Sequence, residues 1–117
     1  MIEYETYQAG ENDDVLVIEV GGRLDTMSSD YLLDCVRAHT DRGSRKIVLD
    51  CTNLDYVSSM GLAALIRANS KMKEVGGSVA LVQVPGLVAE VVRIAHLDRL
   101  LNIYPSVDEA IAQILKS

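Results

Sequence analysis

Signatures of several large classes of proteins are missing from this 117-residue sequence. No apolar run approaches the roughly 20 residues that a membrane-spanning helix needs, so we expect no membrane insertion. The first residues, Met1-Ile2-Glu3-Tyr4-Glu5, show no basic region followed by an apolar stretch, so no secretory signal is expected. Membrane and secreted proteins are therefore unfavoured classes.

Basic residues are also few. Eleven Lys and Arg stand against 17 Asp and Glu, which gives a formal net charge of −6. Such a chain repels a phosphate backbone on average, so nucleic acid is a poor partner. The densest cationic segment, Arg42-Gly43-Ser44-Arg45-Lys46, falls at a predicted turn.

The sequence has two cysteines and two histidines. Cys35 and Cys51 each lie inside an apolar pattern, so we expect buried thiols of a reducing cytoplasm rather than a disulfide. His39 and His96, with these cysteines at scattered spacing, form no metal motif. His39 lies on the apolar face of a predicted helix, and His96 follows Ala95 at a helix end, where the dipole favours a cation, so we expect structural roles for both.

Motifs of common enzyme classes are absent as well. There is no Walker A sequence and no G-x-G-x-x-G. The segment Val57-Ser58-Ser59-Met60-Gly61 lacks the first glycine of a G-x-S-x-G nucleophile turn. We therefore expect no catalytic residue, no metal and no cofactor.

The composition is that of an ordinary globular chain. Hydrophobic residues make up 49% and charged residues 24%, close to the averages for soluble domains. A chain of this length can bury one core of its own, so we expect a single domain over residues 1–117.

Strand and helix patterns alternate along the chain. Strands are expected at residues 2–7, 15–20, 47–49, 79–84 and 100–104. Helices are expected at about 28–40, at 59–75, from Pro85 to about Ala95, and after a capping box formed by Ser106 and Glu109. The order ββαβαβαβα predicts an α/β fold with a mixed, mostly parallel sheet, an initial hairpin and helices mainly on one face.

Apolar spacing predicts the buried face of each helix. The residues expected to face the core are Leu32, Cys35, Val36 and His39 in the first helix, Leu62, Leu65, Ile66, Met72 and Val75 in the second, and Val88, Val91, Val92 and Ala95 in the third. Gly43 and Gly76-Gly77 stand where helix ends are expected.

The connection from Cys51 to Ser58 reads as a loop that leads to the start of the second helix. Serine is a preferred N-cap, and the free N–H groups of a helix start stabilise a phosphate. Gly61, in the first turn, is unfavourable for a helix and suggests that something approaches the backbone closely. The two adjacent serines leave both roles open, because one can cap the helix while the other is free.

This region carries a family resemblance. Residues 47–66, IVLDCTNLDYVSSMGLAALI, resemble the signature of STAS-domain anti-sigma-factor antagonists, in which an apolar strand ending in Asp precedes a regulatory serine two positions before a glycine. Gly22-Arg23-Leu24-Asp25 is similar to the family's segment between its second strand and first helix. The order of elements matches over nearly the whole chain.

The resemblance implies roles for particular residues. Ser59 falls on the phosphorylated serine, with Ser58, which stands where several members have Asp, as the alternative acceptor. Asp25 falls on an acidic residue near the phosphorylation site. Val84-Pro85-Gly86-Leu87 opens the third helix at the same sheet edge, so Leu87 either packs in the core or extends a docking surface. The expected partner-binding residues are Asp25, Thr26, Ser58, Ser59, Met60, Gly61 and Leu87.

The function that the resemblance implies is a partner switch. The unphosphorylated protein binds an anti-sigma factor, a serine kinase of the GHKL type, and thereby releases a sigma factor. Phosphorylation ends this binding, and a metal-dependent serine phosphatase restores it. The alternative is a STAS module that is not phosphorylated and acts as a ligand-binding or scaffold component of a signalling complex.

Asp50, at the end of a strand, invites comparison with the phosphorylated aspartate of response-regulator receivers. Receivers also need an acidic pair after the first strand and a lysine near the last. Glu19 and Asp25 do not form such a pair, and no lysine lies between Gly77 and Ile114. We therefore expect Asp50 to accept hydrogen bonds from nearby backbone N–H groups.

Overall fold

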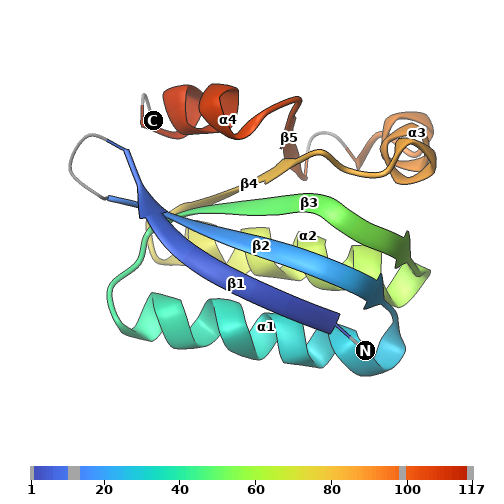
Figure 1. The fold of residues 1–117 in the computed structure, drawn as a ribbon, viewed down its shortest axis with the longest axis horizontal. Helices are drawn as coiled ribbons and strands as arrows, with labels where there is room; N and C mark the ends of the chain where they lie inside the picture. The colour runs from blue at the N-terminus through green and yellow to red at the C-terminus, as the bar shows by residue number, and fades with distance from the viewer. Residues whose placement is uncertain (1, 11–13, 98–99, 116–117) are drawn as a thin grey trace.

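The computed structural model of the chain describes residues 2–10, 14–97 and 100–115, which are built around one sheet (Figure 1). Within them, five strands stand in the order β1-β2-β3-β4-β5. The strands are β1 (Ile2–Ala9), β2 (Val15–Leu24), β3 (Lys46–Val57), β4 (Ser78–Val82) and β5 (Asn102–Tyr104). β1 runs antiparallel to β2, and the other neighbouring strands are parallel. The predicted mixed, mostly parallel sheet is confirmed.

The helices cover the two faces of the sheet unequally. They are α1 (Thr26–Asp41), α2 (Ser59–Glu74), α3 (Gly86–Ile94) and α4 (Val107–Ile114). Figure 1 shows α1 and α2 below the sheet, α4 above it, and α3 near the end where β3 finishes. α1, α2 and Val92 of α3 contribute to one core and α4 to the other, so helices lie mainly on one face, as expected.

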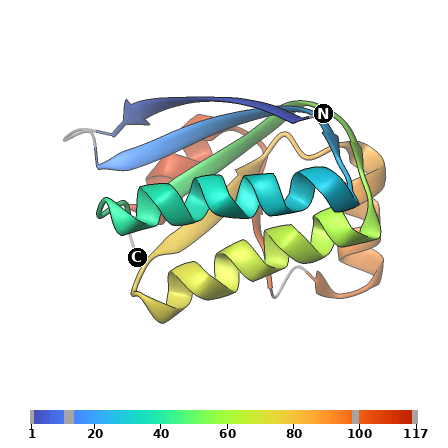
Figure 2. The same cartoon turned by 90° about the horizontal axis from the view of Figure 1, so that it is seen from below.

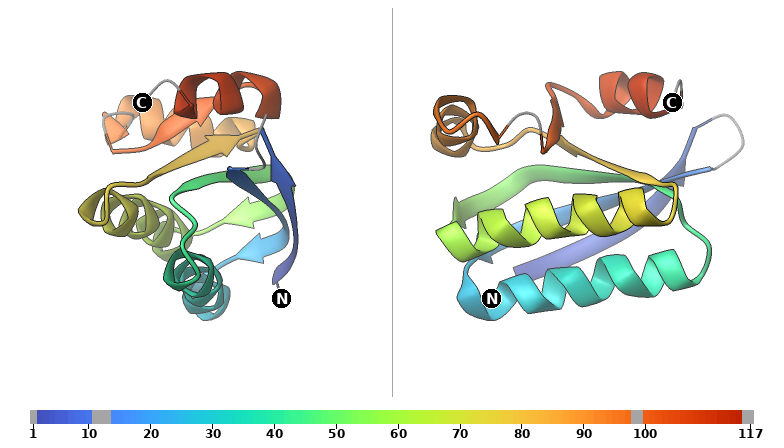
Figure 3. Two further views of the ribbon diagram at one scale, coloured as in Figure 1. Left: turned by 90° about the vertical axis from the view of Figure 1, so that its left-hand side faces the viewer. Right: turned by 180° about the vertical axis from the view of Figure 1, so that it is seen from behind.

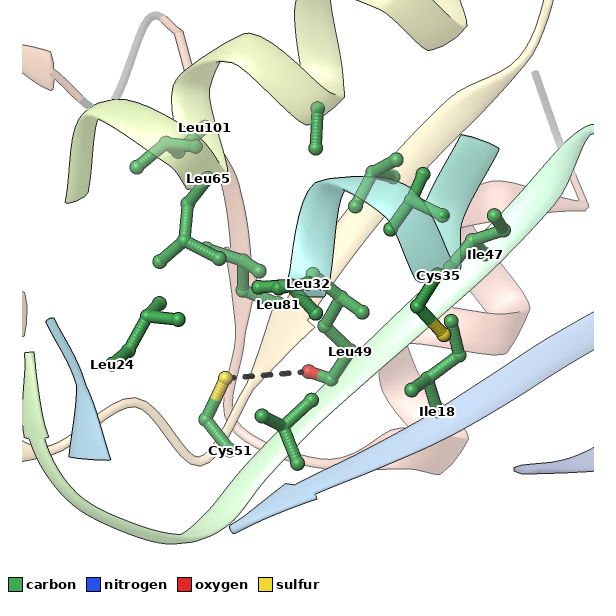
Figure 4. Close-up of a cluster of buried hydrophobic side chains, with 14 of the residues drawn as sticks. Ile18, Leu24, Leu32, Cys35, Ile47, Leu49, Cys51, Leu65, Leu81 and Leu101 are labelled. Carbon is green, nitrogen blue, oxygen red and sulfur yellow. Dashed lines mark hydrogen bonds between the residues drawn. The ribbon is translucent and has the colours of Figure 1, made fainter. Parts of the chain in front are cut away.

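The larger core lies between the sheet and the pair α1 and α2. Figure 4 shows side chains from β2 and β3, among them Ile18, Ile47 and Leu49, meeting Leu32 of α1 and Leu65 of α2. Cys35 and Cys51 belong to this core as free thiols, as predicted. Burial raises the pKa of the Cys51 thiol to about 12, so it stays protonated at neutral pH.

A smaller core lies on the other face. Val15, Val17 and Val48 alternate along their strands with residues of the larger core and pack with Ala110 and Ile114 of α4. Because side chains of a strand alternate between its faces, β2 and β3 can serve both cores. Ser106 caps α4 by accepting a hydrogen bond from the Glu109 N–H at 3.2 Å.

The expected loop from Cys51 to Ser58 was wrong, because β3 continues to Val57. Its partner β2 likewise continues past Gly21-Gly22 to Leu24, so the two strands pair over this stretch with shifts in register. The glycines permit the irregularity: a Cβ on Gly21 would lie 3.3 Å from Asn53 Cβ, and Gly22 has a φ of +95°. Sequence cannot easily separate this pairing from a loop, since glycine usually ends a strand.

The expected inner face of the third helix was half right: Val88 and Val92 pack in the larger core, but Val91 and Ala95 do not. In α3 only Val92 is buried, whereas Val91 is 52% exposed and Ala95, just beyond the helix, is exposed as well. Val75, at the end of α2, is exposed too. Helical spacing identified the apolar positions, but α3 packs only one narrow side against the core.

Candidate functional site

Three helices begin at the edge of the sheet where β2 and β3 end. α1 follows β2 after Asp25, and α2 follows β3 after Ser58. Figure 2 shows α1 and α2 side by side and starting at the same end, and the right-hand view of Figure 3 shows α3 at the same end of the molecule as the start of α2. The Ser58 N–H donates a 2.8 Å hydrogen bond to the Leu24 carbonyl, which joins the two strand ends directly.

The Ser58 side chain is the N-cap of α2. Its backbone is extended, and its hydroxyl oxygen accepts a hydrogen bond from the Gly61 N–H at 3.0 Å. The residue is half-buried. This hydroxyl thus satisfies one of the free N–H groups of the helix start.

Ser59 is the first residue of α2 and is exposed. Within the described residues, its side chain takes part in no hydrogen bond. Met60, the next residue, is 49% exposed. The two adjacent serines therefore differ in geometry: one hydroxyl is used by the helix cap, and the other is accessible at the helix start.

Gly61 lies where no side chain fits. It is buried, and an added Cβ would stand 2.4 Å from the Leu24 carbonyl oxygen and 3.0 Å from Leu24 Cγ. Sequence analysis predicted a close approach to this glycine, and the approaching group is the end of β2. Gly61 thus brings the beginnings of α1 and α2 together.

Asp25 closes the start of α1. Its carboxylate accepts hydrogen bonds of 3.1 Å from the N–H groups of both Met27 and Ser28. The Asp25 N–H in turn donates to the Ser28 hydroxyl at 2.9 Å, and that hydroxyl donates to the Arg23 carbonyl at 2.6 Å. These bonds, first the one from the Ser28 N–H, lower the pKa of Asp25 below its ordinary value of 3.8. Thr26, the first helical residue, is exposed beside it.

Several apolar side chains of α1, α2 and α3 are exposed. Met27 is 88% exposed and Leu87 is 83% exposed. Leu87, Val91 and Ile94 follow the spacing of one face of α3, and all three are exposed. We call Met27, Met60, Leu87, Val91 and Ile94 the apolar rim. Leu87 therefore does not pack in the core.

Sequence analysis missed part of this rim. Val91 was assigned to the core, and Met27 and Ile94 were not singled out. One signal was available for Met27, because it stands two residues after a helix cap, as Met60 does. Both methionines at this place are exposed in the structure.

Asp50 has the predicted structural role. Its carboxylate accepts a hydrogen bond from the Thr52 N–H at 3.0 Å and another from the Thr52 hydroxyl at 2.5 Å. His39 is half-buried near the end of α1, and His96 is exposed beyond α3. Among residues 2–10, 14–97 and 100–115, no group of three His, Cys, Asp or Glu side chains is placed to hold a metal ion.

Comparison with known sequences gives the family. A model of the STAS domain matches residues 6–110, so the chain belongs to the STAS domain family. BtrV of Bordetella bronchiseptica, which bears the name of an anti-sigma factor antagonist, is 30% identical over 93 residues, or 80% of this chain and 78% of BtrV.

Solved structures agree on the fold. An anti-sigma factor antagonist from Mycobacterium paratuberculosis superposes with a TM-score of 0.84 at 20% identity, covering 98% of this chain and 95% of its own. Unphosphorylated SpoIIAA superposes with a TM-score of 0.71 at 13% identity, covering 98% and 99%. SpoIIAA of Bacillus has also been solved phosphorylated, again with a TM-score of 0.71, at 16% identity over 96% and 99%. No helix in the described part of our chain is long and apolar enough to cross a membrane.

Proposed function

We propose that this protein is an anti-sigma factor antagonist that docks an anti-sigma factor on the apolar rim and is switched off by phosphorylation of Ser59. It performs no chemistry itself. BtrV bears the name of an antagonist of this kind. The observation that carries the proposal is the difference between the adjacent serines, because Ser58 caps α2 while the Ser59 hydroxyl is exposed and unbonded among described residues.

The start of α2 can carry a phosphate without refolding. Only one N–H of the first turn, that of Gly61, is taken by the Ser58 hydroxyl, and the remaining helix start favours an anion. A phosphate on Ser59 adds about −1.5 to −2 charges. The fold would persist, whereas the docking surface would change sharply.

The same phosphate would oppose docking. Met60 of the apolar rim follows Ser59 directly, and a partner that covers Met60 must remove the phosphate from water. Burying an unpaired charge is costly. The protein also carries a net charge of −6, so an acidic partner surface would be repelled further.

The expected partner is an anti-sigma factor with a GHKL-type serine kinase fold, which would supply the phosphate from ATP. A metal-dependent serine phosphatase would remove it. SpoIIAA, which shares the fold, has been solved in phosphorylated and unphosphorylated forms. That pair of structures supports a phosphorylation switch as a mode of action available to this fold.

The first test joins partner capture with phosphopeptide mapping of residues 47–67 from native cells. We expect a GHKL-type kinase to be recovered with the unphosphorylated protein only, and phosphate on Ser59. Ser59→Ala should abolish the phosphate and retain the partner, while Ser58→Ala, a matched loss of one hydroxyl, should still be phosphorylated. Phosphate on Ser58 would identify Ser58, rather than Ser59, as the serine that accepts the phosphate. No phosphate and no kinase under several growth conditions would favour the non-phosphorylated STAS module instead.

The apolar rim can be tested separately from phosphorylation. Leu87→Ala removes a side chain that is 83% exposed, so it should weaken capture of the partner and leave the free energy of unfolding nearly unchanged. Val75→Ala is the matched control, because Val75 is an exposed aliphatic residue at the far end of α2. Equal capture by both variants would remove Leu87 from the docking surface.

A further inference from the structure

The edge of the sheet formed by β1 is long and open. The sheet has two edges, β1 with eight residues and β5 with three. β5 is half-buried, and Leu101 and Ile103 beside and within it pack against the larger core. The left-hand view of Figure 3 shows β1 at the outer margin of the sheet, next to no other strand but β2.

β1 is also only partly covered on its two faces. Thr6 stands opposite Ile18 and so faces the side of α1, whereas Tyr7 stands opposite Val17 and faces the side of α4. Every residue from Tyr4 to Gln8 is nevertheless exposed. The helix layers reach β1 only near its ends: the ring centroids of Tyr4 and of Tyr31 in α1 are 5.9 Å apart, and Ala9 packs against the smaller core.

The strand carries one guard against edge pairing, the charge of Glu5, and lacks several others. Residues 4–8 contain no proline and no lysine, and β1 pairs with β2 in unbroken register, without a bulge. In an antiparallel edge strand, every second residue turns its N–H and C=O away from the sheet. These groups form a template for another strand.

We infer that β1 is a dimerisation edge and that its partner is β1 of a second copy, paired antiparallel across a two-fold axis at Thr6. The two sheets then join into one of ten strands. A two-fold axis perpendicular to the sheet keeps each residue on its own face, so odd residues meet odd residues and even residues meet even residues. In this register Thr6 meets Thr6 of the partner copy, and Glu5 meets the Tyr7 position.

Side-chain chemistry selects this register over its neighbours. An axis at Glu5 would place two carboxylates opposite each other, which is destabilising. An axis at Tyr7 would place Tyr4 opposite Gly10, beyond the end of β1 at Ala9. With the axis at Thr6, the Tyr7 hydroxyl can donate to the Glu5 carboxylate, and Tyr4 lies opposite the Gln8 amide.

The dimer should be weak and reversible. One strand pair buries less than the roughly 1,200–2,000 Å² of stable interfaces. Each copy carries a net charge of −6, so association should tighten when salt screens the repulsion. In the antiparallel dimer, Ser59 of one copy and Ser59 of the other lie at opposite ends of the joined sheet. Dimerisation therefore leaves the proposed docking surface of each copy free.

Cysteine cross-linking tests the edge and the register together. In the proposed register the Cα atoms at position 6 lie about 4.5–5.5 Å apart, within disulfide range. Thr6→Cys should therefore form a covalent dimer under mild oxidation at least tenfold faster than Gln8→Cys, whose Cα atoms would be about 14 Å apart. Cys35 and Cys51 are buried in both variants.

A charge swap provides the second readout, by sedimentation of the full chain. Thr6→Lys should abolish association, because two lysines meet on the axis, whereas Ser70→Lys, the same charge change on an exposed face of α2, should not. Mixing Thr6→Lys with Thr6→Glu should restore a heterodimer. A wild type that stays monomeric at about 1 mM, or equal cross-linking at positions 6 and 8, would overturn the inference. Circular dichroism confirms that each variant is folded.

Discussion

The beginnings of α1 and α2 lie side by side and correspond residue by residue. Asp25 and Ser58 are the caps, Thr26 and Ser59 the first helical residues, and Met27 and Met60 the second. Ser28 and Gly61 follow in the third place. Both starts show a hydroxyl and a methionine to solvent, yet their hydrogen bonding differs.

The difference lies in what already occupies each helix start. At α1, the Asp25 carboxylate accepts two N–H groups and Ser28 completes the box, so an anion is in place. At α2, a neutral hydroxyl accepts one N–H, and Gly61 has no side chain to add. The comparison teaches that α1 has a closed, structural start, whereas α2 keeps its capacity for a phosphate on Ser59.

The largest expected effect is on the free energy of unfolding, for a substitution at the third residue of α2, Gly61. Gly61→Ala would place a Cβ 2.4 Å from the Leu24 carbonyl oxygen, and such overpacking costs about 3 kcal/mol. Ser28→Ala, at the matching place in α1, loses a side chain that fits and should cost about 1 kcal/mol. Urea unfolding measures both. If Gly61→Ala were as stable as wild type, the contact between β2 and α2 would be looser than described.

The next effect is on partner binding. Ser59→Asp places a charge at the free helix start beside Met60. We expect it to lower the affinity for the captured anti-sigma factor roughly tenfold or more, and each factor of ten corresponds to about 1.4 kcal/mol. Thr26→Asp adds the same charge beside Asp25, where a carboxylate is already present, so its effect should be smaller. Titration calorimetry with the captured partner compares them. A greater loss of partner affinity in Thr26→Asp than in Ser59→Asp would assign the switch to the start of α1.

A smaller effect separates the two serines. Ser58→Ala removes the acceptor of the Gly61 N–H and should lower the free energy of unfolding by about 1 kcal/mol. Ser59→Ala removes an exposed hydroxyl and should change it by less than about 0.5 kcal/mol. Thermal or urea unfolding at neutral pH measures the difference. The reverse order of stability would exchange the roles of cap and free hydroxyl.

The smallest effect concerns pH and the cap of α1. Because the pKa of Asp25 is lowered in the folded protein, its charge stabilises the fold above pH 3.8, and this contribution is lost as pH falls through the lower, folded value. Asp25→Asn keeps a capping side chain but has no charge to lose. The stability gap between wild type and Asp25→Asn should therefore narrow on acidification. A constant gap would mean that the charge contributes nothing.

The sequence predicted the fold where one physical rule dominated. Continuous apolar strands and helix caps such as Ser106 placed the elements correctly, because burial and capping act locally. Gly21-Gly22 misled the prediction, since a glycine pair that usually ends a strand here lets β2 and β3 stay paired through a change of register. That pairing depends on a contact with Asn53, distant in sequence.

The candidate site divides in the same way. Ser59, Gly61 and Leu87 were predicted at one sheet edge, and the structure places them there. The exposure of Val91 was not predictable, because an apolar helix face has the same sequence pattern whether it packs against the core or against a partner. Which serine caps α2 was open too, since the answer depends on where Leu24 meets the start of the helix.

The slight anchoring of α3 has a consequence for hydrogen exchange. Among its nine residues, Val92 alone is buried, so this helix should open locally with far less free energy than unfolding of the sheet requires. Its amides would then exchange with solvent quickly, whereas the amides of β2 and β3 would exchange only when the whole domain unfolds. A partner seated on Leu87, Val91 and Ile94 would slow exchange in α3 first, and part of the binding energy would go into holding this helix in place.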